Sequence, residues 1–431
     1  MDYQAVTNFI NQAKKFGSRL DLSRITKLCT LLGNPERKCR FVHVAGTNGK
    51  GSTSVYIENI LMQAGYKTGL YTSPFIYEFN ERIQINNTPI PDEALQNCME
   101  QIVDATEQMI KDGDEHPTEF ELITAAAFLY FAQEACDVVV LEVGLGGILD
   151  ATNVIENPLV SVLVSISHDH MEYLGNTLSE IAGNKCGIIK KGCPVVSYAY
   201  QEEEVLQVIR ETAEKQGCGL TIPETESLQI EKTDLSGNRF SYGGVCYEMK
   251  LIGSFQIYNA ITAISVAECM ASHGFDISKE HIRAGLACAK WPARFEILHT
   301  SPIIIADGSH NADGMRAFVE TAKKSLDGKK VVCVFGMLRD KEYEMCLKSL
   351  SEITDTVIVT EVDNPRKESV EQLRETAEKY MSVVYAEKNN KDAVARAIEL
   401  SGKTDAVIAL GSLYMMKNIK DAVEKLFPKK V

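Results

Sequence analysis

The chain has 431 residues and a net charge of -14 at neutral pH. A chain of this length predicts two domains rather than a single core. The charge argues against a nucleic-acid partner, because binding a phosphate backbone requires a broad basic surface. The first residues lack the apolar segment of a signal peptide, and no stretch approaches the roughly 20 apolar residues of a membrane helix. We therefore expect a cytoplasmic, monomeric protein without membrane segments.

The twelve cysteines are scattered between Cys29 and Cys346 and include no CxxC pair. Disulfide frameworks and zinc sites usually show a regular, close cysteine spacing. The cysteines are therefore interpreted as buried, reduced thiols.

A glycine-rich loop follows the first apolar run of the chain. Residues 41–53 read FVHVAGTNGKGST, and a helical pattern continues from Ser54 to Ala64. Backbone N–H groups of such a turn and of the following helix bind phosphate, and Lys50 adds a full positive charge. The loop is not a strict GxxxxGK[ST] motif, because valine occupies the first glycine position and a glycine separates the lysine from the serine. The order of strand, turn, lysine and helix predicts a nucleotide site, with a chance glycine turn as the alternative.

Strand and helix patterns alternate along most of the chain. The first part contains a helical pattern at Asp92–Lys111 and buried strand patterns at residues 41–44, 138–143, 160–166 and 194–196. A polar, alternating stretch at residues 221–251 predicts a β-hairpin insertion in this part. A second series of strand patterns lies at residues 303–306, 331–335, 356–360, 383–385 and 406–410. The sequence thus predicts two α/β domains, residues 1–293 and 299–431, joined by a linker at 294–298.

Polar residues follow several of these predicted strands, at the edge where open α/β sheets bind ligands. Residues 141–153 read LEVGLGGILDATN and place Glu142 at the end of a buried strand. A carboxylate there can bind magnesium opposite a phosphate loop, or form a structural salt bridge. Residues 165–170 read SISHDH, although histidine is an unusual magnesium ligand. Residues 71–75, YTSPF, either contribute to the same edge or form only a turn.

Together these segments resemble the folylpolyglutamate synthase and dihydrofolate synthase family of the Mur ligase superfamily. The resemblance extends in family order over nearly the whole chain, through GTNGKGS, YTSP, FNERI, EVGLGG with DATN, DH, WPARFE, DGSHN and GSLY. It implies a P-loop ATPase domain with a small β insertion and a Rossmann-like C-terminal domain, with ATP and substrates bound between them. The implied reaction phosphorylates a carboxylate of a reduced folate or of dihydropteroate. The amine of L-glutamate then displaces phosphate, and ADP is released.

The resemblance also implies a role for individual residues. The implied ATP site comprises Gly46, Thr47, Asn48, Gly49, Lys50, Gly51, Ser52, Asn259, Arg294, His310 and Asp313. The implied magnesium site comprises Ser73, Glu142, His170 and Lys185, the last as a carbamylated lysine. The implied folate site comprises Arg82, Thr118, Phe120, Asp150 and Ala151. The residues implied in catalysis are Lys50, Asp150, His170, Lys185 and Arg294.

Some of these assignments have a structural alternative. Lys185 could equally be a surface lysine, and Phe120 an ordinary core residue. Arg82 could equally form a surface ion pair. The chain departs from the family pattern at Phe75, Ile148, Asn184 and Ala312, and the first two of these put the substrate preference in doubt. The sequence does not decide between dihydrofolate synthase, folylpolyglutamate synthase or both.

Two further classes of function were compared with the folate ligase. A Mur-type ligase acting on a cell-wall precursor usually has an additional N-terminal substrate domain and TT after the lysine, and this chain has neither. A nonenzymatic nucleotide-binding protein would leave Asp150, His170 and Arg294 without a role. The folate ligase is therefore the leading hypothesis.

Overall fold

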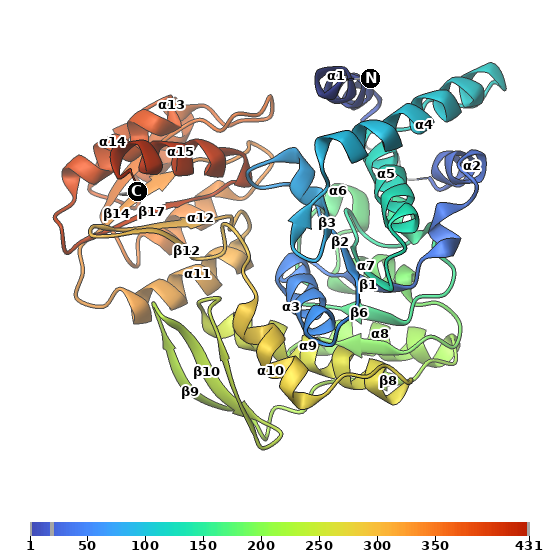
Figure 1. The fold of residues 1–431 in the computed structure, drawn as a ribbon. Coiled ribbons are helices and arrows are strands. Elements are labelled where there is room, and N and C mark those ends of the chain that lie inside the picture. The colour runs from blue at the N-terminus through green and yellow to red at the C-terminus, as the bar shows by residue number, and fades with distance from the viewer. Residues whose placement is uncertain (1, 18–20, 429–431) are drawn as a thin grey trace. The chain divides into compact units, whose positions relative to one another are not determined.

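The computed structural model describes residues 2–17 and 21–428, and the chain divides into two compact units. The first unit comprises Met1–Leu228 and Tyr258–Ala289, and the second comprises Gln229–Ile257 and Lys290–Val431. Figure 1 colours the chain from the N-terminus in blue to the C-terminus in red. Each unit is an α/β structure with its own sheet, which confirms the predicted fold class.

The first unit contains an eight-stranded sheet in the order β4-β3-β2-β5-β1-β6-β7-β8. The six neighbouring strands from β2 to β8 in this order are parallel, and β3 and β4 add antiparallel pairs at one edge. The strands are β1 (Phe41–Ala45), β2 (Thr68–Tyr71), β3 (Ile83–Ile85), β4 (Thr88–Pro89), β5 (Val138–Glu142), β6 (Val160–Leu163), β7 (Val195–Ser197) and β8 (Leu220–Thr221). The central strands are continuous apolar runs because helices cover both faces of a parallel sheet. This sheet places the ends of β1, β5 and β6 side by side.

The helices of the first unit follow the amphipathic patterns of the sequence. They are α1 (Tyr3–Ala13), α2 (Ser23–Leu31), α3 (Lys50–Gln63), α4 (Asp92–Lys111), α5 (Glu119–Gln133), α6 (Met171–Leu174), α7 (Leu178–Lys185), α8 (Glu203–Lys215), α9 (Ser254–Ser272, whose first residues belong to the second unit) and α10 (Lys279–Cys288). Helix α4 has the predicted bounds. Helix α3 begins at Lys50, four residues before the predicted start, because Gly49 with φ 91° is its N-cap. The lysine of the loop is therefore already the first helical residue.

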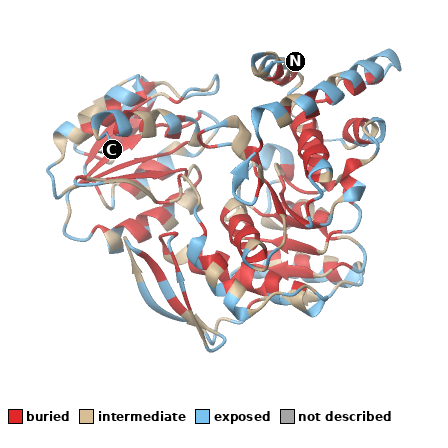
Figure 2. Ribbon diagram, in the orientation of Figure 1, coloured by how far each residue is buried: buried red, intermediate tan, exposed pale blue. Residues whose placement is uncertain are grey.

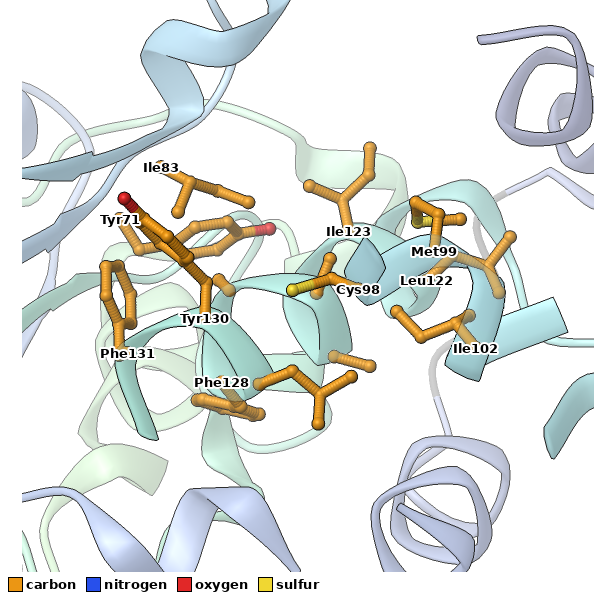
Figure 3. Close-up of a cluster of buried hydrophobic side chains, with 14 of the residues drawn as sticks. Tyr71, Ile83, Cys98, Met99, Ile102, Leu122, Ile123, Phe128, Tyr130 and Phe131 are labelled. Atoms are coloured by element: carbon orange, nitrogen blue, oxygen red, sulfur yellow. The ribbon is translucent and has the colours of Figure 1, made fainter. Parts of the chain in front are cut away.

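One hydrophobic core of the first unit forms around α5, which is apolar on every side and almost entirely buried. Figure 3 shows Phe128 and Phe131 of this helix with Tyr71, while Cys98, Met99 and Ile102 lie beside Leu122 and Ile123. Helix α4 supplies Cys98, Met99 and Ile102 from its apolar stripe. The red ribbons in Figure 2 show the same burial along the central strands of the large sheet of each unit. This packing gives the loops at the strand ends a rigid support.

Residues 221–251 contain a three-stranded antiparallel sheet instead of the predicted hairpin. Its strands are β9 (Gln229–Asp234), β10 (Gly237–Tyr242) and β11 (Val245–Met249), in the order β11-β10-β9. Leu235 packs against the hydrophobic core of the second unit, so this sheet belongs to that unit and not to the first. The sequence could not show this, because an alternating strand pattern does not specify what its apolar face covers. The domain limits 1–293, 294–298 and 299–431 stay a prediction.

The second unit also contains a six-stranded sheet in the order β12-β13-β17-β14-β15-β16, in which only β12 is antiparallel. Its strands are β12 (Glu296–Thr300), β13 (Ile303–Asp307), β14 (Val331–Phe335), β15 (Thr356–Val359), β16 (Val383–Ala386) and β17 (Ala406–Leu410). Its helices are α11 (Ala312–Ser325), α12 (Tyr343–Leu350), α13 (Val370–Ala377), α14 (Asn390–Leu400) and α15 (Met416–Leu426). All five strand patterns predicted after residue 298 are confirmed.

All twelve cysteines are free thiols, as predicted, but only seven are buried; Cys39, Cys218, Cys246 and Cys269 are partly exposed and Cys288 is exposed, so the predicted burial is wrong for these five. Among residues 2–17 and 21–428, no helix combines the length and the apolar character that crossing a membrane requires.

Candidate active site

The glycine-rich loop connects β1 to α3 at the centre of the first sheet. A Cβ atom on Gly46 would lie 2.3 Å from the Val164 side chain, and one on Gly49 would lie 2.5 Å from Asn259 Oδ1. Both positions have positive φ angles, so only glycine fits this backbone without strain. The predicted adenosine contact Asn259, on α9, therefore lies directly against the loop. This geometry leaves backbone N–H groups and the N-terminus of α3 at the end of β1, as a phosphate site requires.

Two lysine side chains bind the backbone of this loop, Lys50 from α3 and Lys185 from α7. The Nζ atom of Lys185 donates to the Gly46 carbonyl at 2.8 Å, and the Nζ atom of Lys50 lies 3.3 Å from the carbonyl oxygens of Gly46 and Thr47. Lys185 is buried, which contradicts the surface alternative. Burial, followed by repulsion from Lys50, lowers the pKa of Lys185 to about 7. Much of its amine is therefore neutral near neutral pH.

Glu142 ends β5, the neighbour of β1, and is buried. Its carboxylate lies 4.0 Å from Lys50 Nζ. Within the described part of the chain, no three His, Cys, Asp or Glu side chains gather into a metal site. Magnesium sites at phosphates commonly use one or two carboxylates, with phosphate oxygens and water completing the shell. Glu142 beside the loop lysine fits such a site.

The loop after β6 is attached to the glycine-rich loop. Thr47 N donates to Ser165 O at 2.7 Å, and Thr47 Oγ1 lies 3.0 Å from Ser167 O and 3.1 Å from Ser167 N. These bonds hold the segment that carries Asp169 and His170. His170 has a φ of 51° and a side chain that is 43% exposed, and its Nε2 lies 3.9 Å from Asp169 Oδ2. The structure thus places His170 on a loop adjacent to the phosphate site.

Arg82 is buried, which contradicts the surface ion pair considered for it. Its Nη2 donates to Ser73 Oγ at 3.1 Å, and its Nη1 lies 3.7 Å from Glu119 Oε1. The guanidinium also lies about 6 Å from the ring centres of Phe79 and Phe120. Its Nε is buried without a hydrogen-bond partner among the described residues. The structure therefore joins a residue of the implied metal site, Ser73, to a residue of the implied folate site.

Phe120 and Thr118 have evident structural contacts. A Cβ atom on Gly144 would lie 2.4 Å from the Phe120 ring, so the ring packs directly on the loop after β5. Thr118 forms a capping box at the start of α5, with its N–H 2.7 Å from Glu121 Oε2 and its hydroxyl 3.3 Å from Glu121 N. Thr118 thus supports the helix that carries Phe120.

Asp150 is buried and binds its own loop. Its carboxylate accepts hydrogen bonds from Leu145 N at 2.8 Å, Thr152 N at 3.0 Å and Thr152 Oγ1 at 2.6 Å. Burial raises the pKa of Asp150 more than these hydrogen bonds lower it. The neighbouring Ala151 is also buried. The carboxylate therefore closes the loop between β5 and residue 152.

In the second unit, the WPARFE segment is attached to the DGSHN segment. Gly308 N donates to Ala293 O at 2.8 Å, and Phe295 N donates to Asp307 Oδ2 at 2.7 Å. Ala293 and Phe295 have φ values of 49° and 48°, so Arg294 lies between two residues in the left-handed region. Such strain persists only where neighbouring contacts enforce it. Asp307 belongs to the DGSHN segment, but the sequence suggested no role for it. Its hydrogen bond from Phe295 N stabilises the left-handed backbone around Arg294.

Arg294 and His310 meet at Gly308. Arg294 Nη1 donates to Ala293 O at 3.1 Å, and a Cβ atom on Gly308 would lie 2.4 Å from this nitrogen. His310 Nδ1 lies 2.9 Å from Gly308 O. Asp313 lies in the first turn of α11 and pairs with Arg316. The structure thus brings Arg294 and His310 together at Gly308. Asp313 lies in the helix that follows His310.

Two family models match the chain. The Mur ligase middle domain matches residues 44–267, and the glutamate ligase domain of Mur ligases matches residues 293–413. The fold and the loop site are therefore those of a Mur ligase.

Individual relatives narrow this class. The dihydrofolate synthase/folylpolyglutamate synthase of Bacillus subtilis is 41% identical over 97% of this chain and 98% of its own length. The folylpolyglutamate synthase of Mycobacterium tuberculosis, solved with ADP and AMPPCP, has a TM-score of 0.88 and 29% identity over 100% of both chains. The E. coli FolC structure with DHPP and ADP has a TM-score of 0.85 and 29% identity over 98% of both chains. The chain belongs to the folylpolyglutamate synthase and dihydrofolate synthase family, whose members are ligases.

Proposed function

We propose that this protein is an ATP-dependent ligase that adds L-glutamate to a reduced folate, to dihydropteroate, or to both. The observation that carries the proposal is the loop at the end of β1, with Lys50 at its helix start and Glu142 4.0 Å from Lys50 Nζ. An anion-binding cradle of this kind, with backbone N–H groups and a lysine, suits the terminal phosphates of ATP. The relatives solved with ADP, AMPPCP and DHPP support the nucleotide and the pterin substrate.

The proposed roles follow the geometry of each group. Lys50 and the loop N–H groups bind the phosphates, while Asn259 lies beside them for the nucleoside. The buried Arg82 with Phe120 supplies a cation and an aromatic face for the folate. Arg294 and His310 provide cationic and polar groups for the phosphate that is transferred. A planar guanidinium matches the charge that develops on a phosphoryl group.

Magnesium is part of this proposal. Ser73, Glu142 and His170 would hold it, and Lys185 would join them if its amine reacts with carbon dioxide to form a carbamate. Burial lowers the pKa of this amine to about 7, which raises the fraction in the neutral form that this reaction requires. Bound magnesium would neutralise the negative charge of the phosphate oxygens. The residues of the chain orient the carboxylate and the glutamate amine for attack.

Product analysis tests the function directly. The purified protein is incubated with ATP, magnesium and glutamate, and either dihydropteroate or a reduced folate is offered, with mass spectrometry of the products. We expect one added glutamate for each ADP and each phosphate released. AMP and pyrophosphate would indicate adenylation and contradict the acyl phosphate route, and an absence of glutamylated product with either substrate would contradict the function.

The alternative is a Mur-type amide ligase that acts on another carboxylate. ADP release with a different carboxylate, and with neither pterin substrate, would support it. We also propose that the protein is a monomer, which size-exclusion chromatography with light scattering tests.

We propose a cytoplasmic location for the protein. The free thiols are consistent with this reducing compartment.

A further inference from the structure

A buried histidine lies in the middle of the central strand of the first sheet. His43 of β1 is fully buried, and its Nε2 lies 2.9 Å from Thr152 Oγ1. Burial, with the positive charge of Lys190, lowers the pKa of His43 to about 3. The imidazole is therefore neutral, with one N–H group. An apolar strand residue would avoid the cost of burying this ring, so its hydrogen bond requires an explanation.

The hydrogen bond continues from Thr152 to Asp150. Thr152 Oγ1 donates to Asp150 Oδ1 at 2.6 Å, and the same carboxyl group accepts from two backbone N–H groups. The hydroxyl has a single proton, so its bond with His43 must be one in which the imidazole donates. This assigns the proton of His43 to Nε2. The buried Nδ1 has no partner among the described residues, as expected for the unprotonated nitrogen of this tautomer.

Asp150 carries the connection into the loop after β5. Its Oδ2 accepts from Leu145 N at 2.8 Å, and the preceding residue, Gly144, packs against the Phe120 ring. Asp150 is therefore bound at both oxygens by its own segment. Its carboxylate acts as a brace between residues 145 and 152, and the brace is attached through Thr152 to the strand that ends in the phosphate loop.

We propose that His43 and Thr152 are positioning residues that hold Asp150, and with it the 144–151 loop, in the shape that binds the folate. This inference rests on the proposed function, since the folate assignment of Phe120, Asp150 and Ala151 belongs to it. The relay, defined as His43, Thr152 and Asp150, acts on the affinity for the folate. Lys50 binds the carbonyl oxygens of Gly46 and Thr47 and not the relay residues, so we expect a smaller effect on nucleotide affinity.

Paired substitutions at position 152 separate the hydroxyl from the shape of the side chain. Thr152→Val keeps the volume and removes the bond to Asp150, whereas Thr152→Ser keeps the hydroxyl. We expect Thr152→Val to raise the KM and the Kd for the accepted pterin substrate about tenfold, with the Kd for ADP within about twofold of the parent. Thr152→Ser should stay within about threefold of the parent in every constant.

The histidine is tested in the same way. His43→Leu should raise the pterin KM in the same direction, and His43→Gln, whose amide reaches the position of Nε2, should restore part of the affinity. If the two residues act as one relay, the His43→Leu/Thr152→Val double variant should be no weaker in pterin binding than the weaker single variant. Fully additive losses would contradict the relay.

A matched control exists in the same row of the sheet. Ser161 of β6 is opposite His43 in the strand register, is fully buried, and donates to Ile188 O at 2.9 Å. Ser161→Ala should lower the Tm without changing the pterin KM. If Thr152→Val also lowers only the Tm, or if it weakens ADP as much as the pterin substrate, the positioning role is wrong. A parent enzyme that ligates neither pterin substrate would instead contradict the proposed function itself.

Discussion

In the first unit, Glu142, Asp150 and Lys185 are almost completely excluded from solvent, whereas Arg294 and His310 of the second unit are only partly buried. A buried charge is costly unless nearby groups satisfy it, and the first unit supplies those groups from its own loops. Arg294 and His310 have hydrogen bonds of ordinary length to neighbouring carbonyl oxygens and keep part of their surface exposed. The first unit therefore holds its site in place before a ligand binds, while the second presents polar groups at little cost of desolvation.

Substitutions should separate these two arrangements. Changes at the fully buried groups of the first unit should alter mainly stability or ligand binding. Changes at Lys50, which is only partly buried, and at the loops of the second unit should act mainly on turnover.

The largest effect is expected from Lys50→Ala. In the proposed function its charge stabilises the phosphates as negative charge shifts during transfer, so kcat should fall on the order of a hundredfold or more. Steady-state kinetics on the folded variant measure this change. Lys67→Ala is the control, because Lys67 forms a surface pair with Glu134 at 2.8 Å and should leave kcat unchanged. A normal kcat in Lys50→Ala would remove the glycine-rich loop from the mechanism.

Arg294→Lys should lower kcat by about ten- to a hundredfold, because an ammonium cannot reproduce the planar guanidinium. The Kd for ADP should change little, since the glycine-rich loop of the first unit is intact. Single-turnover rates and nucleotide titration measure the two quantities separately. Arg374→Lys, at an exposed helical pair with Glu378, is the control. Loss of nucleotide binding with normal turnover would make Arg294 an anchor of the bound nucleotide.

Gly308→Ala tests whether the second unit also needs an exact loop shape. The added Cβ would lie 2.2 Å from the Leu413 side chain and 2.4 Å from Arg294 Nη1, and both side chains can move aside. We expect kcat to fall on the order of tenfold with little change in Tm, because the guanidinium is displaced. Gly219→Ala is the matched control, since a Cβ there has no neighbour within 4 Å. Unchanged kcat in Gly308→Ala would show that the position of Arg294 is set by the bound ligand alone.

The smallest effect is on stability and concerns the first unit. Burial raises the pKa of Glu58 from 4.5 to about 7, against a hydrogen bond from Asn87 N that lowers it, and Oε2 has no partner among the described residues. Between these two pH values the folded state holds a proton that the unfolded state has released. The free energy of unfolding should therefore decrease as pH rises from 4.5 to 7.

Glu58→Gln removes this titration and keeps an acceptor for Asn87. At pH 8 the variant should be more stable than the parent by about 1–2 kcal/mol, and near pH 4.5 the two should be similar. Chemical denaturation at both pH values measures this difference. Glu107→Gln, on the exposed face of α4, should show no such pH dependence. An equal gain at both pH values would exclude the buried charge as the cause.

The sequence by itself determined the elements and the phosphate loop. The apolar runs that become β1, β5 and β14 and the amphipathic helix α4 are local patterns, and their bounds depend on side-chain periodicity and helix caps within a few residues. The order of strand, glycine turn, lysine and helix likewise lies within thirteen consecutive residues, 41–53. Local physical chemistry is sufficient to recognise such features.

Only the tertiary structure decided which distant groups meet. Lys185 reaches the carbonyl of Gly46 across 139 positions, and His43 reaches Thr152 across 109, because the sheet order places β1 between β5 and β6. The three-stranded sheet of residues 229–249 likewise packs with the second unit because of contacts with residues remote in the sequence. Burial of a lysine, a histidine or an apolar strand face depends on what covers it, and the covering elements come from remote parts of the chain.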